Sequence, residues 1–276
     1  MPEFPEVTVV SRALNESLKH RYIAKINYET NKIIQNDSLD SFNNKVIDKK
    51  ILKVYNIGKF IIFELEKNIN IISHLRMEGK YFIESLEQLN DNYRNRKHDL
   101  VYFYLDNGDV LIYNDTRRFG TLEAFEGDVY LAKPIKKLAK LPWDIDVEEI
   151  YNKTQKKRIP IKSALLDQNI ILGLGNIYCD EVLHASKINP FRSSDSITKD
   201  QIQMIVKNAS SIMQDSISKG GSSVNTYTSV NSKSGTYQNY LKVYGRANKP
   251  CFNCGEKLTK AKLNGRGTTY CERCQK

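Results

Sequence analysis

Four of the five cysteines in this 276-residue chain form two C-x-x-C pairs near its C-terminal end. Cys251 pairs with Cys254 and Cys271 with Cys274, and 16 residues separate the two pairs. Each pair can bring two thiolates to one metal ion on a tight turn, and two pairs complete a tetrahedral sulfur site. Two disulfides are the alternative, but we expect a leaderless cytoplasmic chain, where disulfides are rare. The cysteines therefore predict one structural zinc ion.

The segment between the cysteine pairs has strand-like ends around an Asn264-Gly265 turn, which predicts a two-stranded zinc ribbon. Gly255 follows the first pair, where such a turn often needs a positive φ. The fifth cysteine, Cys179, stands alone in an apolar helical stretch. We interpret it as a core residue.

The first three residues, Met1-Pro2-Glu3, could carry nucleophilic chemistry. A small second residue permits removal of Met1, which would leave Pro2 as a free secondary amine. An α-amino group has an ordinary pKa of about 7.7–8.0, so part of it is neutral and nucleophilic near pH 7. Attack on a sugar C1′ would give an iminium ion, and Glu3 could move protons during that step. By itself this indicates little, because most Met-Pro starts have no catalytic role.

Two further segments have two interpretations each. Lys59 opens a strand in Gly58-Lys59-Phe60 and could act as an acid or contact phosphate, or be an ordinary exposed lysine. The segment from His74 to Gly79 follows a strand end and places the apolar Met77 on a loop. A methionine there is usually buried packing, but it can also be a wedge inserted into a base stack.

The segment from Asn114 to Gly120 places two guanidinium groups, those of Arg117 and Arg118, beside Phe119. Arginine next to an aromatic ring suits pairing to base edges and stacking on bases. A salt-bridged turn is the alternative interpretation.

The stretch from Gln168 to Tyr178 carries two glycines, Gly173 and Gly175, between two apolar helical segments. We predict that Asn176 is the N-cap of the second helix. A helix N-terminus with free N–H groups is a phosphate site. The pattern is not a dinucleotide fingerprint, because no strand precedes it and the full G-x-G-x-x-G is missing.

The elements that must position these residues predict an α+β protein. Apolar residues at helical spacing predict a helix over residues 6–20, and alternating runs over residues 22–130 predict an antiparallel sandwich or barrel. Within the strand region, residues 106–109 form a hairpin turn. Helices are predicted at about 144–152, 160–168, 177–186 and 198–218, the last opened by a Thr198-Lys-Asp-Gln201 capping box. Residues 218–235 are a loop rich in Gly, Ser, Thr and Asn, either a linker or functional.

This organisation predicts an N-terminal β-sandwich domain over residues 1–135, a helical domain over 136–240 and a zinc finger over 241–276. The finger carries nine basic and two acidic residues, and therefore holds most of the net charge of +10. A basic excess in one module indicates a polyanion partner or a solvated surface.

Composition excludes several classes of protein. Apolar residues make up 40% and charged residues 27% of the chain, which excludes disorder, collagen and coiled coil. No apolar stretch is long enough to cross a bilayer, and the acidic N-terminus is unlike a signal peptide. We expect a cytoplasmic protein.

Taken together, these motifs identify a family resemblance. Pro2-Glu3-Phe4-Pro5-Glu6-Val7, Lys59, residues 74–79, 114–120 and 173–181 and the four-cysteine finger occur in one order along the chain. That order resembles the formamidopyrimidine-DNA glycosylases, the bacterial 8-oxoguanine-DNA glycosylase/AP lyases. The likeness runs from Pro2 to Lys276. It implies an N-terminal β-sandwich with a flanking helix, a helix–two-turn–helix domain and a zinc-ribbon finger.

The resemblance also implies an activity. Oxidised purines, both 8-oxoguanine and formamidopyrimidines, would be excised from duplex DNA through a Schiff base, and β,δ-elimination would leave a one-nucleotide gap. Pro2 would be the nucleophile, Glu3 the acid/base, Lys59 the proton donor in β-elimination and Arg266 the phosphate-gripping arginine of δ-elimination. Zinc would fold the finger without a catalytic role.

Further roles concern DNA contacts. The DNA-contacting positions implied are His74, His98, Arg117, Arg158, Lys162 and Asn176. A triad would fill the gap left by an everted nucleotide, and it consists of Met77, Arg117 and Phe119. Glu6 would lie near the base pocket, and residues 218–235 would cap the lesion. The expected partner is damaged double-stranded DNA, bound by a monomer that associates with the bacterial nucleoid and not with membranes.

Some positions depart from the family pattern. Thr8 stands in place of a glutamate and Phe4 in place of a leucine, while Arg76, Glu78 and Thr116 lie beside the triad where other residues are usual. None removes a catalytic group, but Arg76 and Glu78 could alter the wedge and the opposite-base preference.

Two alternatives stay open. One is a sister enzyme resembling endonuclease VIII, which prefers oxidised pyrimidines. Met77 and the Arg-Arg-Phe run favour the purine type over it. The other is a damage-binding protein or transcription factor without chemistry, which loss of Pro2 or Glu3 would have indicated.

Overall fold

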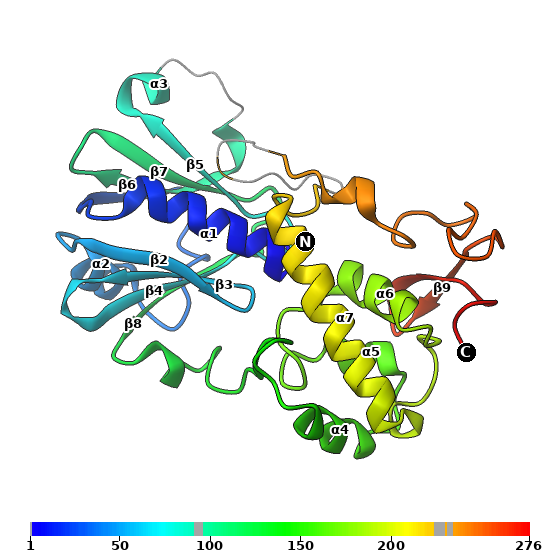
Figure 1. Ribbon diagram of the computed structural model, residues 1–276. Helices are drawn as coiled ribbons and strands as arrows, with labels where there is room; N and C mark the ends of the chain where they lie inside the picture. Colours follow the sequence, from blue (N-terminus) through cyan, green and yellow to red (C-terminus); the bar gives the residue numbers. More distant parts are fainter. Residues whose placement is uncertain (1, 91–95, 224–229, 231–233) are drawn as a thin grey trace. The chain divides into compact units, whose positions relative to one another are not determined.

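The computed structural model describes residues 2–90, 96–223, 230 and 234–276 (Figure 1). Across those residues, no helix is both long and apolar enough to cross a membrane. The chain divides into two compact units. The first comprises Met1–Pro2, Glu6–Lys136 and Gly220–Gly235, and the second Glu3–Pro5, Lys137–Lys219 and Thr236–Lys276. The finer division into domains at residues 135 and 240 stays a prediction.

The first unit contains two four-stranded antiparallel sheets. One has the order β1 (Ile23–Tyr28), β6 (Asp99–Leu105), β7 (Asp109–Asn114) and β5 (Lys80–Ser85). The other has the order β2 (Ile51–Ile57), β3 (Phe60–Leu65), β4 (Ile69–His74) and β8 (Thr121–Glu126). The predicted sandwich is confirmed, as is the hairpin turn over residues 106–109, which joins β6 to β7.

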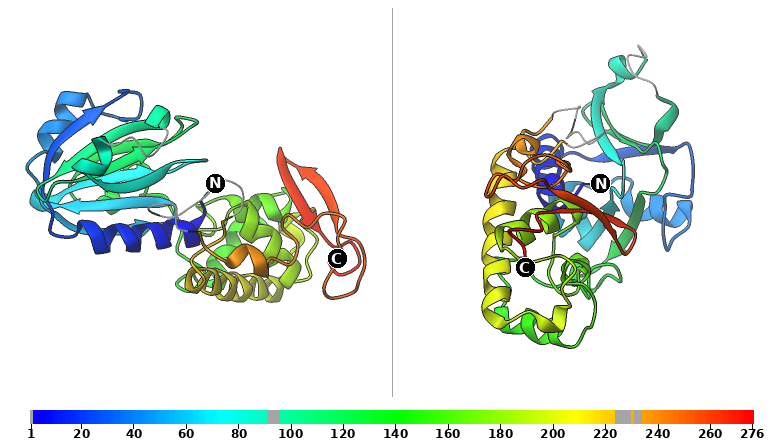
Figure 2. Two further views of the ribbon diagram at one scale, coloured as in Figure 1. Left: turned by 90° about the horizontal axis from the view of Figure 1, so that it is seen from above. Right: turned by 90° about the vertical axis from the view of Figure 1, so that its right-hand side faces the viewer.

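A hydrophobic core lies in this unit. It takes side chains from both sheets, such as Phe63 of β3 and Phe103 of β6. Helix α1 (Phe4–Leu18) adds an apolar stripe to that core, and Leu14 and Leu18 of the stripe are fully buried. Figure 2 shows the strands stacked in two layers along this helix. Helix α1 buries residues three or four apart and β8 buries alternate residues, which is why periodicity predicted such elements, whereas every residue of β4 is buried.

Helix α1 begins and ends two residues earlier than the predicted 6–20. It ends at Leu18 because the chain turns there, and His20 adopts a positive φ of 71°. The remaining elements of the unit are short. They are α2 (Leu39–Val46), α3 (Leu86–Asn90), and the 3-10 turns η1 (Glu66–Asn68), η2 (Arg96–His98) and η3 (Val129–Leu131).

The second unit is helical. Its helices are α4 (Val147–Gln155), α5 (Ile161–Leu166), α6 (Asn176–Ala185) and α7 (Lys199–Ser218), with the 3-10 turns η4 (Ser194–Ser196) and η6 (Tyr237–Tyr240). All four predicted helices are present, with ends that differ by at most three residues. The capping box is confirmed: the Thr198 hydroxyl accepts from the Gln201 N–H, and the Gln201 side chain accepts from the Thr198 N–H.

The C-terminal hairpin belongs to the same unit and consists of β9 (Thr259–Leu263) and β10 (Arg266–Tyr270). Asn264 and Gly265 connect the two strands with φ values of 45° and 79°. Positive φ at both residues is typical of the turn that a two-residue hairpin needs. The predicted ribbon is confirmed.

Candidate nucleic-acid interface and reaction centre

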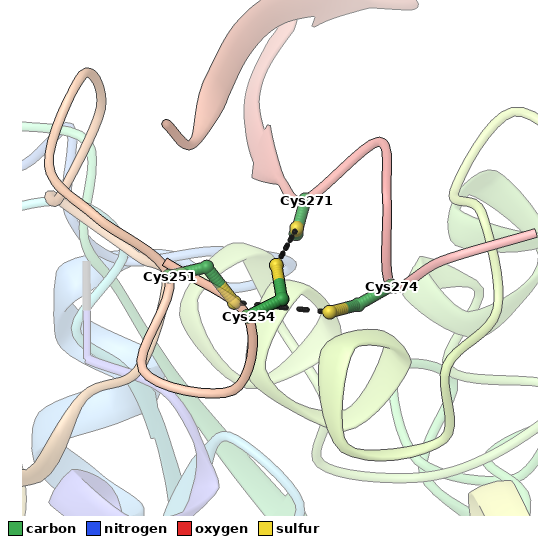
Figure 3. A group of neighbouring side chains, drawn as sticks. All are labelled: Cys251, Cys254, Cys271 and Cys274. Atoms are coloured by element: carbon green, nitrogen blue, oxygen red, sulfur yellow. Dashed lines mark hydrogen bonds between the residues drawn. The ribbon is translucent and has the colours of Figure 1, made fainter. Parts of the chain in front are cut away.

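The four cysteines of the finger lie together and point toward one another (Figure 3). Their Sγ atoms are all within 4.8 Å of one another, with 4.0 Å between those of Cys251 and Cys274 and 3.5 Å between those of Cys254 and Cys271. Sulfur atoms at the corners of a tetrahedral zinc site lie about 3.8 Å apart. The donor set and spacing fit the ion, and the finger holds a structural zinc. Gly255 has the expected positive φ, 76°.

The finger is also connected to helix α6. The Nε2 atom of His184, a buried residue of α6, lies 3.4 Å from the Sγ of Cys251. Partners outside the coordination shell commonly orient the ligands of a metal site. His184 therefore links the zinc site to the interior of the second unit.

Glu3 is bound at the N-terminus of α6. Its carboxylate accepts hydrogen bonds from the backbone N–H groups of Gly175 (2.9 Å), Ile177 (2.8 Å) and Tyr178 (3.3 Å). The first N–H groups of a helix have no partner within the helix, and a negative charge is favoured there. Only glycine fits at position 175, because a Cβ would lie 2.3 Å from the carboxyl carbon of Glu3. The residue after Pro2 is thus fixed in place.

The prediction that Asn176 is the N-cap of α6 is wrong. Gly175 is the N-cap, and it makes no side-chain capping hydrogen bond. The physical reason is that Glu3 supplies the capping carboxylate from 172 residues away. Asn176 is instead the first helical residue, and its side-chain amide donates to the Gly267 carbonyl of the finger hairpin (3.0 Å).

Lys162 lies in the interior of the second unit. Its side chain has no exposed surface, and its Nζ lies 2.7 Å from the Asp180 carboxylate. The same Nζ donates to the Gly267 carbonyl (3.0 Å) and the Thr268 hydroxyl (2.9 Å). Two of the three N–H donors of the ammonium form these hydrogen bonds, and the contact with Asp180 is an ion pair. Lys162 is therefore an anchor of the hairpin, and its side chain presents no exposed surface to a phosphate.

Asp180 completes this anchor. Its second carboxylate oxygen accepts from the backbone N–H of Thr269 (2.9 Å). Burial raises the pKa of Asp180 to about 6, against the lowering effect of Lys162. Arg266, three residues before Thr269, is exposed at the start of β10. The anchor fixes the backbone that carries Arg266 and leaves its guanidinium exposed.

Two loops of the first unit carry the predicted triad, and we call them the wedge loops. Residues 75–79 join β4 to β5, and residues 115–120 join β7 to β8. The loops are neighbours because the residues at their ends are paired, His74 with Thr121 and Lys80 with Asn114.

The triad side chains are available on these loops. Met77 is 37% exposed and Phe119 54% exposed. The guanidinium carbon of Arg117 lies 4.8 Å from the centre of the Phe119 ring, within cation–π range. The structure thus brings all three predicted wedge residues to one end of the sandwich.

Asp115 organises the second wedge loop. Its buried carboxylate accepts from the backbone N–H groups of Arg117 (2.9 Å), Phe119 (2.9 Å) and Gly120 (2.8 Å). Asp115 was not among the site residues predicted from the sequence. An aspartate that opens a turn and bonds to N–H groups two residues on is a common turn device, and that pattern could have identified it.

His74 is buried at the start of the first wedge loop. Its Nδ1 accepts from the backbone N–H of Arg76 (2.9 Å), so the proton of the neutral ring is on Nε2. Burial lowers the pKa of His74 to about 3. The ring is therefore neutral at physiological pH and can offer a hydrogen bond, but no charge, to a phosphate.

Glu6 is buried in α1 and holds the start of the segment predicted to cap a lesion. Its carboxylate accepts from the backbone N–H of Ser222 (2.8 Å), next to Gly221 with a φ of 78°. Much of the predicted loop, residues 224–229 and 231–233, lies outside the described residues.

The remaining predicted site residues differ in how far they are buried. Lys59 is buried in the turn between β2 and β3, and His98 is half-buried, its carbonyl accepting from the Asp115 N–H. Arg158 is 93% exposed and lies 3.4 Å from the Asp195 carboxylate. Pro2 is buried.

Three domains of known protein families match most of the chain. Residues 1–122 match the formamidopyrimidine-DNA glycosylase N-terminal domain, residues 139–228 the formamidopyrimidine-DNA glycosylase H2TH domain, and residues 248–276 the zinc finger found in FPG and IleRS. The chain belongs to the formamidopyrimidine-DNA glycosylase family. It is 42% identical to the formamidopyrimidine-DNA glycosylase of Mycoplasma mobile, over 100% of this chain and 99% of the relative.

Solved structures of the formamidopyrimidine-DNA glycosylase family share the whole fold. A complex of a Lactococcus lactis FPG mutant with Fapy-dG containing DNA has a TM-score of 0.92, with 34% identity and complete coverage of both chains. A complex of MutM with carbocyclic 8-oxo-G containing DNA has a TM-score of 0.91, also with 34% identity and complete coverage of both chains.

In this member of the formamidopyrimidine-DNA glycosylase family, α6 positions a further segment that the sequence analysis missed. The buried carboxylate of Glu181 accepts from the backbone N–H groups of Lys242, Val243 and Tyr244, at 2.7–2.9 Å. Two adjacent acids inside an apolar helical stretch were the available indication, because buried carboxylates are rare unless they are paired or hydrogen-bonded.

Proposed function

We propose that this chain is a bifunctional DNA glycosylase/AP lyase that removes oxidised purines from duplex DNA through a Schiff base on Pro2. The binding of Glu3 to the N-terminus of α6 carries this proposal, because it fixes a carboxylate directly after Pro2, whose nitrogen becomes the terminal amine once Met1 is removed. Family membership supports a DNA glycosylase. Relatives bound to Fapy-dG and 8-oxo-G containing DNA support oxidised purines as substrates.

The chemistry begins once Met1 is removed, because the nitrogen of Pro2 is then an amine instead of an amide. Its lone pair attacks C1′ of the damaged nucleotide, and the C1′–N bond to the base breaks. The three N–H donors stabilise the ionised carboxylate of Glu3, which is placed to move protons during the attack. The product is an iminium ion that joins Pro2 to the opened sugar.

Strand cleavage follows from the iminium ion, which acidifies the C2′ proton. Loss of this proton expels the 3′ phosphate, with Lys59 as the proton donor of that β-elimination. A second elimination expels the 5′ phosphate, for which Arg266 grips the phosphate. A gap of one nucleotide results, and hydrolysis of the imine frees the enzyme.

Binding to damaged duplex DNA is assigned to groups on both units. His74, His98, Arg158 and Asn176 would contact DNA, and Met77, Arg117 and Phe119 would fill the space of the everted nucleotide. Glu6 supports the base pocket through the Ser222 segment. For Lys162 we replace direct phosphate contact with anchoring of the Arg266 hairpin. The proposal includes a cytoplasmic monomer that reaches the nucleoid through DNA binding.

The test is borohydride trapping on a duplex with one 8-oxoguanine opposite cytosine. The processed protein should give a covalent adduct and a cleaved strand. A chain with an N-terminal extension that retains an amide at Pro2 should lose the adduct by about a thousandfold or more. The same chain after proteolytic removal of the extension, which frees the Pro2 amine, is the matched control and should trap normally.

Each alternative predicts another result. An adduct formed only on a thymine glycol duplex would select the endonuclease VIII-like type. Binding without any adduct, on abasic DNA as well, would support the non-enzymatic damage-binding protein. A fully active protein that retains Met1 would contradict the role of Pro2.

A further inference from the structure

The two wedge loops share one support. The phenol of Tyr113, at the end of β7, lies against Gly79 of the first loop and Gly120 of the second. A Cβ at either glycine would lie within 2.3 Å of the Tyr113 hydroxyl oxygen, far inside contact distance. Tyr113 is fully buried, so this support is part of the core. The bases of both loops are therefore fixed against one ring.

A second link joins the loops nearer to the triad. The hydroxyl of Thr116 donates a hydrogen bond to the carboxylate of Glu78. Glu78 follows Met77 directly, and Thr116 precedes Arg117 directly. The structure thus places these two residues in contact with each other. The bond connects the loop that carries Met77 to the loop that carries Arg117 and Phe119.

We propose that Thr116 is a positioning residue for the wedge, and this inference rests on the proposed function. Its bond to Glu78 holds the two loops at one spacing, so that the side chains on both loops enter the duplex as a unit. Without the bond, Met77 would move independently of Arg117 and Phe119, since Tyr113 fixes only the loop bases. Loss of the bond should slow insertion into a paired duplex more than into a duplex that is already open.

The test compares Thr116→Val, which keeps the shape and removes the donor, with Thr116→Ser, which keeps the donor. Insertion is followed by the fluorescence of 2-aminopurine beside the lesion, and excision by single-turnover cleavage of 8-oxoguanine opposite cytosine. We expect Thr116→Val to slow both by about five- to tenfold, the size of one lost hydrogen bond to a charged group at a partly exposed site. Thr116→Ser should stay within about twofold of wild type.

Two comparisons separate positioning from a general structural defect. On a duplex with an abasic analogue opposite the lesion, where the stack is already open, Thr116→Val should regain the wild-type rate. In a double-mutant cycle, adding Thr116→Val to Glu78→Ala should cause no further loss.

Equal rates for Thr116→Val and wild type would overturn the proposal. So would equal slowing on both duplexes, or additive effects in the cycle. A wild-type protein that leaves the lesion intact would count against the proposed function instead. The 2-aminopurine signal needs no chemistry, so it still decides the role of Thr116 in that case.

Discussion

Helix α6 and the wedge loops both rely on carboxylates that bind backbone N–H groups, but the bonded segments differ. Around α6, carboxylates and backbone N–H groups connect segments that are far apart in the sequence: the chain start through Glu3, the finger hairpin through Asp180 and residues 242–244 through Glu181. In the wedge loops, the corresponding carboxylate of Asp115 binds N–H groups two to five residues away. The first arrangement joins separate segments, and the second shapes a single turn.

The difference corresponds to what each region would do in the proposed reaction. Groups that react must keep fixed positions, and buried carboxylates bound to N–H groups keep the segments that carry them in place. Groups that enter a duplex must be free at their tips, so the structure fixes the backbone and leaves Met77 and Phe119 exposed. Buried polar contacts are costly to break, because an abandoned partner stays in the interior. Substitutions around α6 should therefore have the larger effects.

The largest effect is expected for Glu3→Gln. The amide would place an NH₂ group against the N–H donors of α6. It would also replace the carboxylate that accepts and donates protons in the proposed reaction. Single-turnover excision should fall by about 10²- to 10⁴-fold. Glu16→Gln, on the exposed side of α1, is the matched control. Excision by Glu3→Gln within tenfold of wild type would place proton transfer on another group.

The next effect concerns the buried ion pair. Lys162→Met leaves the Asp180 carboxylate without its counter-ion, and we expect the free energy of unfolding to fall by about 3–5 kcal/mol. Urea titration of the zinc-saturated protein measures this change in the free energy of unfolding. Lys153→Met, which breaks the exposed pair with Glu149, should cost less than about 1 kcal/mol.

The double variant Lys162→Met/Asp180→Asn distinguishes the cause. It removes both charges and keeps an acceptor for the Thr269 N–H, so most of the lost stability should return. A double variant as unstable as Lys162→Met alone would show that packing, and not the unpaired charge, is responsible.

An intermediate effect is expected from His74 at low pH. Its pKa is about 3 in the folded chain against an ordinary 6.5, so the folded state binds fewer protons between these values. The contribution of His74 to the free energy of unfolding is fully present above pH 6.5. It is lost as the pH falls below 6.5, by up to about 1.4 kcal/mol per pH unit. The difference in unfolding free energy between wild type and His74→Gln should shrink from pH 6.5 to pH 4. A constant difference would show that the folded ring accepts a proton normally.

The smallest effect is expected at the start of α7. Thr198→Ala removes one half of the capping box and should lower the free energy of unfolding by about 1 kcal/mol, measured by urea titration. Excision should not change, because no proposed site residue lies on this helix. A change in excision at unchanged stability would mean that α7 takes part in the reaction.

Local patterns predicted much of the fold. The apolar stripe of α1, the strands, the hairpin over residues 259–270 and the capping box each depend on residues within a few positions of one another, and all are confirmed. The four cysteines predicted the zinc site for the same reason, since each pair is a local turn.

Non-local contacts account for what the sequence analysis missed. The capping of α6 by Glu3 and the burial of Lys162 both depend on segments more than 100 residues away. The pairing of Glu78 with Thr116 depends on strands from different parts of the chain meeting at one end of the sandwich. No period or spacing in the sequence contains that information.

The contact between His184 and Cys251 makes the stability of the protein depend on the concentration of free zinc. Because this contact joins the zinc site to the interior of α6, zinc bound to the finger also stabilises the helical unit. Each tenfold rise in free zinc above the dissociation constant then adds about 1.4 kcal/mol to that stability. The supply of zinc in the cell thus becomes one of the variables that set how much folded enzyme is present.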